Sequence, residues 1–131
     1  MRRIGYAALS TMLASAIENH LKTLLRMAGE SLTDRADWRC LGCTFSRHTG
    51  KGFAQLGCYA DVRLVSSLSN AFKHNSCRAG KELAGRLGIA QGDAVDYAAQ
   101  DWDRLFDKAE AFVADIASEL GLVGAPRGWT T

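Results

Sequence analysis

The sequence predicts an all-α fold, a bundle of three long helices and one short helix. Apolar residues recur at steps of three and four in three long stretches, which is the period of an amphipathic helix. The one proline, Pro126, lies near the end of the chain, so no proline interrupts these stretches. With 131 residues, 47% of them apolar and 23% charged, the chain is long enough for one domain with one core. We expect that domain over residues 1–124 and a flexible tail over 125–131.

The first helix is expected over residues 4–28, with Gly29 as its stop. Its apolar stripe consists of Leu9, Leu13, Ile17, Leu21, Leu24 and Ala28. Residues 30–56 are different, because they contain several glycines and scattered charges and show no sustained period. We therefore expect an irregular insertion at 30–56.

The second long helix is expected over residues 57–74, with Asn75 as a left-handed C-terminal cap. Its apolar stripe consists of Val62, Val65, Leu68 and Phe72. Ser76 is expected to cap a short helix at about 80–87, which Gly88 ends.

The last helix is expected to begin at Asp101 and to be closed by Gly121. It has the clearest apolar face of the chain, formed by Trp102, Leu105, Phe106, Ala109, Val113, Ile116 and Leu120. The opposite face is charged, which is typical of a helix packed on one side of a bundle.

The net charge of +2 hides an uneven distribution. Between Trp38 and Lys81 the only acidic residue is Asp61, against the basic residues Arg39, Arg47, Lys51, Arg63, Lys73, Arg78 and Lys81. A local basic surface of this kind attracts phosphate groups, although the same pattern is also found on helices that are simply solvated by Lys and Arg.

The N-terminal Arg2-Arg3 and the apolar residues after it imitate a secretory signal. The helical pattern, however, continues past the small residues at 14–16 through Leu21 and Leu25. No apolar run approaches the length of a membrane span. We expect a cytoplasmic protein without a membrane partner.

The four cysteines have the spacing C-x2-C-x14-C-x18-C, at Cys40, Cys43, Cys58 and Cys77. A CxxC pair with two further cysteines, or with His48 in place of one, is able to hold zinc tetrahedrally. The second CxxC that makes such a signal strong is absent, so ordinary thiols are favoured and no cofactor is expected. The segment Gly50-Lys51-Gly52 lacks the spacing of a phosphate loop.

The most informative polar residues lie at the end of the second long helix. Ser67, Asn70 and His74 share one helical face, and Arg63 belongs to the same stripe. A histidine beside Lys73 is suited to acid–base work on a ribose hydroxyl or a phosphate. The alternative is a surface histidine near a helix C-terminus, where the helix dipole favours its charge.

At these residues the chain resembles the HEPN family, the helical domain of many prokaryotic toxins and defence proteins. The resemblance is carried by residues 16–25 (AIENHLKTLL), 70–75 (NAFKHN), and by 81–84 (KELA) with 92–93 (GD) and 101–102 (DW). It covers most of the chain outside 30–56. Active members carry an arginine, four to six residues and a histidine, often with a polar residue directly after the arginine.

The resemblance implies an RNA-directed toxin or defence protein, a metal-independent endoribonuclease that acts as a homodimer. His74 is then the motif histidine, Asn70 the polar residue, and Ser69 the position of the missing arginine. Leu68 and Ser67, at the longer spacings, do not supply an arginine either. Because a neutral serine cannot hold phosphate or stabilise developing charge, activity is expected to be weak or absent.

The other basic residues expected to contact RNA are Arg63, Lys73 and Arg78. The alternative is a non-catalytic HEPN module that mediates dimerisation and binds a protein or a nucleic acid, such as one component of a toxin–antitoxin pair with a cognate antitoxin. A weaker third hypothesis is a zinc-stabilised regulatory domain.

Overall fold

The computed structural model describes residues 3–122 and is helical, as predicted. Its α-helices are α1 (Arg3–Met27), α2 (Trp38–Thr49), α3 (Tyr59–His74), α4 (Lys81–Leu87) and α5 (Trp102–Glu119), with short 3₁₀ turns η1 (Phe53–Gln55) and η2 (Tyr97–Ala99). Within the described residues no strand forms, and β-type pairing is limited to one bridge between Arg78 and Ala94. The all-α class is therefore confirmed. No helix in this part of the chain is both long and apolar enough to cross a membrane.

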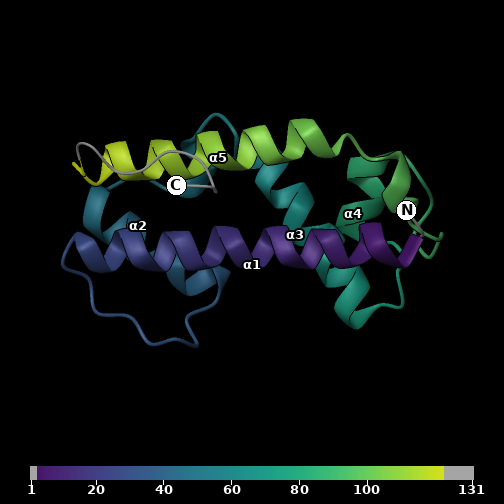
Figure 1. The fold of residues 1–131 in the computed structure, drawn as a ribbon, viewed down its shortest axis with the longest axis horizontal. Coiled ribbons are helices and arrows are strands. Elements are labelled where there is room, and N and C mark those ends of the chain that lie inside the picture. The colour runs from purple at the N-terminus through teal and green to yellow at the C-terminus, as the bar shows by residue number, and fades with distance from the viewer. Residues whose placement is uncertain (1–2, 123–131) are drawn as a thin grey trace.

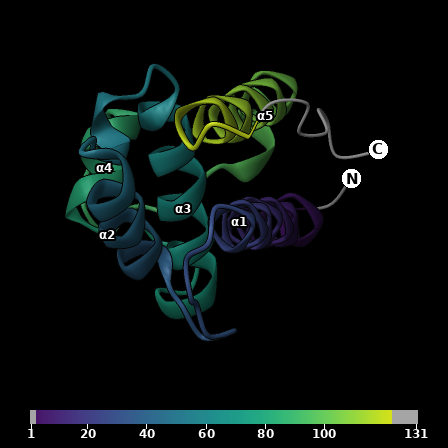
Figure 2. The same ribbon diagram turned by 90° about the vertical axis from the view of Figure 1, so that its left-hand side faces the viewer.

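Helices α1 and α5 lie side by side and run in the same direction (Figure 1). Helix α3 packs against both of them and lies between this pair and the helices α2 and α4 (Figure 2). The two shorter helices are at opposite ends of the molecule, α2 near the end of α1 and α4 near its beginning (Figure 1). The C-terminal half of α3 is thus covered by α1 on one side and by α4 on another.

The predicted apolar stripes form the core. Almost fully buried are the predicted stripe residues Leu13, Ile17 and Leu21 of α1, Val62, Val65 and Leu68 of α3, and Ile116 of α5. Leu25 and Phe112, which were not in the predicted stripes, are buried as well. The predicted helix ends at Gly29 and Gly121 are also confirmed, because both glycines adopt the positive φ of a helix C-terminal cap. The expected tail over 125–131 lies outside the described residues.

The prediction of an irregular insertion at 30–56 is wrong, because this segment contains α2 and η1. Asp37 caps α2 by accepting a hydrogen bond from the backbone N–H of Cys40, and Gly50 ends it with a φ of 78°. Its buried face is short and consists of Leu41, Thr44 and Phe45. The helix is held mainly by contacts with residues outside it.

Those contacts form an aromatic cluster that joins α2 and η1 to α5. The ring centroid of Phe53 lies 5.1 Å from those of Trp38 and Phe45 and 5.4 Å from that of Phe112. Aromatic pairs at such distances add stabilisation beyond the area that they bury. Distant aromatic residues, rather than local periodicity, therefore fix α2.

The turn after α3 also differs from the prediction. Asn75 has a φ of −134°, and the left-handed residues are Ser76 and Cys77, with φ of 50° and 62°. The backbone N–H of Cys77 donates to the carbonyl of Ala71, and the Asn75 side chain donates to the carbonyl of Arg78, so the turn satisfies its own polar groups. Gly80, not Ser76, occupies the N-cap of α4.

Candidate functional site

A groove of about 380 Å³ lies between the C-terminal half of α3 and the beginning of α4. It is lined by Ser67, Asn70, Ala71, His74, Asn75, Gly80, Lys81, Glu82 and Leu83. One wall is therefore a single face of α3, and the other is the first turn of α4. The turn at 75–80 closes the end of the groove.

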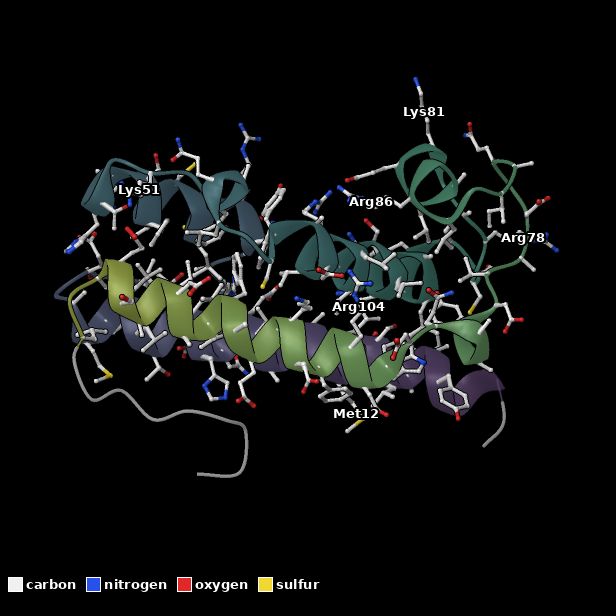
Figure 3. The ribbon with its side chains drawn as sticks, turned by 90° about the horizontal axis from the view of Figure 1, so that it is seen from above. Met12, Lys51, Arg78, Lys81, Arg86 and Arg104 are labelled. Atoms are coloured by element: carbon white, nitrogen blue, oxygen red, sulfur yellow. The ribbon has the colours of Figure 1, made fainter. Side chains whose placement is uncertain are left out.

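The α3 wall carries the predicted polar stripe. Ser67, Asn70 and His74 share this face because they are spaced by three and four residues. Asn70 and His74 are exposed, whereas Ser67 is only 8% exposed and lies deeper. Hydroxyl, amide and imidazole groups thus line one wall, and Lys81 lies on the other, with its side chain extending outward from α4 (Figure 3).

Arg63, one further turn along the same stripe, is engaged by Glu82 of α4. An Arg63 Nη2 nitrogen lies 2.6 and 2.8 Å from the two Glu82 carboxylate oxygens. Arg86 reaches the same carboxylate at 3.1 Å. Hydrogen bonding from Arg63, reinforced by Arg86 against the effect of burial, holds the pKa of Glu82 below its ordinary value.

Ser69, the position of the missing arginine, does not face this groove. Its side chain is 1% exposed, and its hydroxyl shares a 3.1 Å hydrogen bond with that of Thr11 on α1. Residues five apart on an α-helix are separated by about 140° around its axis. The structure therefore brings together His74, Asn70 and Ser67, and turns Ser69 to the opposite helix.

The two other basic candidates are placed separately. Lys73 is exposed on α3, and Arg78 donates a 3.0 Å hydrogen bond to the carbonyl of Gly92. Neither side chain is among those that line the groove. Figure 3 shows Lys81, Arg78 and Arg86 at one end of the molecule and Lys51 at the other.

The charge asymmetry along the sequence is largely balanced in space. Arg47 pairs with Glu30, Lys51 with Glu119, and Arg63 with Glu82. All three acids lie outside the basic segment 38–81. Three of the seven basic residues of this segment are thus paired with acids, and of the seven it is Lys81 that lines the groove.

The register of α3 is held from behind by Tyr97 of η2. The Tyr97 hydroxyl donates a 2.7 Å hydrogen bond to the carbonyl of Leu68, and the Trp102 indole donates to the carbonyl of Tyr97 at 2.8 Å. Burial, with a smaller effect of Cys77, raises the pKa of the Tyr97 phenol well above its ordinary value. A buried, protonated tyrosine therefore anchors the groove-bearing half of α3.

The four cysteines are free thiols. Cys40 and Cys43 are exposed on α2, whereas Cys58 and Cys77 are partly buried. His48, the other suggested zinc ligand, lies 2.8 Å from Glu30. No three His, Cys, Asp or Glu side chains among residues 3–122 are grouped to hold a metal ion. The segment Gly50-Lys51-Gly52 directly follows α2, where Gly50 is the C-cap and Lys51 pairs with Glu119.

Sequence reasoning included Lys81 in the basic segment 38–81 but did not single it out, and it missed Glu82 and Arg86. The spacing of Glu82 and Arg86 is that of a helical i,i+4 ion pair, which was a visible signal. Arg63 and Glu82 are 19 residues apart, and no signal in the sequence indicated that they pair. Their pairing depends on how the turn after α3 sets α4 against it.

Comparisons with protein-family models, with characterised proteins and with solved structures find no match to this chain. The resemblance to the HEPN family therefore rests on the residues quoted above.

Proposed function

We propose that this chain is a HEPN-like RNA-binding module that holds a backbone phosphate in the α3–α4 groove and does not cut the RNA. The observation that carries the proposal is that the stripe of Ser67, Asn70 and His74 lines the same groove as Lys81. The opposite orientation of Ser69 supports the second half of the proposal.

The groove has the chemistry of a phosphate site. An amide N–H, a hydroxyl and an imidazole N–H are donors for phosphate oxygens, and the Lys81 ammonium supplies the opposite charge. No Phe, Tyr or Trp side chain is among the groove-lining side chains of the described residues, so the His74 imidazole is the one ring there on which a base could stack. Contacts of this kind position the backbone without reading the sequence.

No arginine is among the groove-lining side chains of the described residues, so the cation that the family motif supplies to stabilise developing charge is absent from the groove. The motif position Ser69 is buried against α1, and Arg63 pairs with Glu82 beside the groove. Removal of one such electrostatic donor lowers catalysis by about two to three orders of magnitude. These residues therefore support RNA binding without cleavage. We propose that the chain is an RNA-directed but inactive member of a toxin–antitoxin or defence system.

We also propose that the module is a homodimer that pairs through α1. Outside the core stripe, α1 carries further apolar residues at Met12, Ala16 and Met27, and two of them, Met12 and Met27, are 67% and 58% exposed. Burial of such side chains against a second copy is favourable. Light scattering should give a dimer for the wild type and a monomer for Met12→Lys. A monomeric wild type at micromolar concentration contradicts this pairing.

Fluorescence anisotropy with a labelled single-stranded RNA tests the binding function. Lys81→Gln should weaken binding about tenfold, because it removes one charge-assisted phosphate contact. Lys51→Gln removes the same charge at the other end of the molecule and is the matched control (Figure 3). Equal effects of the two substitutions, or no RNA binding by the wild type, would rule out the groove as the binding site.

A further inference from the structure

Two arginines from different helices converge on one carboxylate beside the groove. Arg63 of α3 and Arg86 of α4 both donate to Glu82, at 2.6 Å and 3.1 Å. Two guanidinium groups against one carboxylate leave a local excess of positive charge. Because Glu82 also lines the groove, this excess is continuous with the surface that carries Lys81 and His74.

We propose that Arg63 and Arg86 form a second phosphate subsite that Glu82 masks, and that a neighbouring phosphate of a bound RNA strand displaces the Glu82 side chain. This inference rests on the proposed RNA binding in the groove and names what regulates it. Glu82 acts as an internal competitor that lowers the affinity for RNA.

The geometry of Arg63, Arg86 and Glu82 fits a carboxylate that another anion is able to replace. Carboxylate and phosphate oxygens are recognised by the same fork of guanidinium N–H groups, so one anion is able to take the place of the other. The Glu82 side chain is 50% exposed, whereas those of Arg63 and Arg86 are 20% and 30% exposed. Of the three side chains, the carboxylate therefore has the most room to turn into water.

The position of the subsite fits a strand that already occupies the groove. Arg63 and Asn70 are seven residues apart on one face of α3, which corresponds to about 10 Å along the helix axis. A stacked strand rises about 3.4 Å per nucleotide, so this distance corresponds to about three nucleotides. One short RNA segment is long enough to reach both subsites.

The masking group is charged under ordinary conditions. The hydrogen bond from Arg63 lowers the pKa of Glu82, so its carboxylate stays ionised at neutral pH and competes as an anion. Glu82→Gln keeps the size and removes the charge. Glu119→Gln is the matched control, because Glu119 also pairs with a cation, Lys51, in a different part of the molecule.

The test is a titration of single-stranded RNA against the wild-type protein, Glu82→Gln and Glu119→Gln at several salt concentrations, with circular dichroism to verify folding. Glu82→Gln should bind about three- to tenfold more tightly, and the slope of log affinity against log salt should become steeper by about 0.7 for one more phosphate. Glu119→Gln should leave both quantities near the wild-type values. The added substitution Arg63→Gln should remove the gain.

The failures of the two proposals are distinguishable. If Glu82→Gln binds no better than the wild type while Lys81→Gln still weakens binding, the masked subsite is overturned and the groove remains. If both acid-to-amide variants tighten binding equally, the gain comes from net charge and the subsite is also overturned. If no variant binds RNA, both proposals fall.

Discussion

The hydroxyl groups of Ser69 and Thr11 lie 3.1 Å apart, and this contact joins α3 to α1. It directs Ser69 into the interface with α1 and leaves His74, five residues later, on the groove side. Ser67, seven residues before His74, shares the groove face. Of the three positions where the family motif allows an arginine, only Ser67 therefore has its side chain beside that of His74.

Ser69→Arg should destabilise the protein by at least about 3 kcal/mol, because it places an unpaired guanidinium in a packed interface. Ser67→Arg is the matched control, since the same side chain is able to extend into the groove. Chemical denaturation of both variants measures the difference. Equal stabilities would show that the interface at Ser69 is not tightly packed.

The same variants test catalysis. Neither the wild type nor Ser69→Arg should cleave a mixed RNA substrate, because the arginine is not aimed at His74. Suppose instead that Ser69→Arg stays folded, cuts RNA, and loses this activity with His74→Ala. The family's cleavage mechanism would then be intact, and the proposal of a non-cleaving module would be wrong.

Phe53→Ala should destabilise the protein by about 3 to 5 kcal/mol, because it removes the central ring of the cluster that joins α2 to α5. Hydrogen exchange should show the largest loss of protection in α2. Phe106→Ala, at a half-buried position of α5, is the comparison for a general loss of aromatic packing. Uniform loss of protection over all helices would contradict a local role for Phe53.

The raised pKa of Tyr97 predicts a loss of stability in alkali. Below the ordinary value of 10.0 the phenol is protonated in both the folded and the unfolded chain. As the pH rises above that value, only the unfolded chain ionises readily, so the free energy of unfolding falls.

Tyr97→Phe should be less stable than the wild type at neutral pH by about 1 kcal/mol, because the hydrogen bond to Leu68 is lost. Its stability should nevertheless fall less steeply between about pH 10 and 12. Tyr6 and Tyr59 are present in both proteins, so the difference in slope reports Tyr97 alone. Parallel pH profiles would contradict the assignment.

The long helices were predictable because each has a local apolar period. The stripes through Leu13 and Ile17 of α1 and through Leu105 and Ile116 of α5 are visible in the sequence and are buried in the structure. Helix α2 was not predictable in this way. Its packing depends on Phe112, which lies more than 60 residues away in sequence.

The groove was predictable only in part. The spacing of Ser67, Asn70 and His74 placed them on one face, and the structure agrees. The wall formed by Lys81 and Glu82 depends on the left-handed turn at Ser76 and Cys77, which no local signal specified because non-glycine residues seldom adopt it. The neutralisation of Arg63 by Glu82 follows from that turn.

The most direct test of the central claim is a titration of isotope-labelled protein with a short single-stranded RNA, followed by two-dimensional NMR. We expect chemical-shift changes concentrated at Asn70, His74 and Lys81, and intact RNA after prolonged incubation. Shifts confined to α2 or to the exposed face of α1, or cleavage of the RNA that His74→Ala abolishes, would contradict a groove that binds phosphate without cutting.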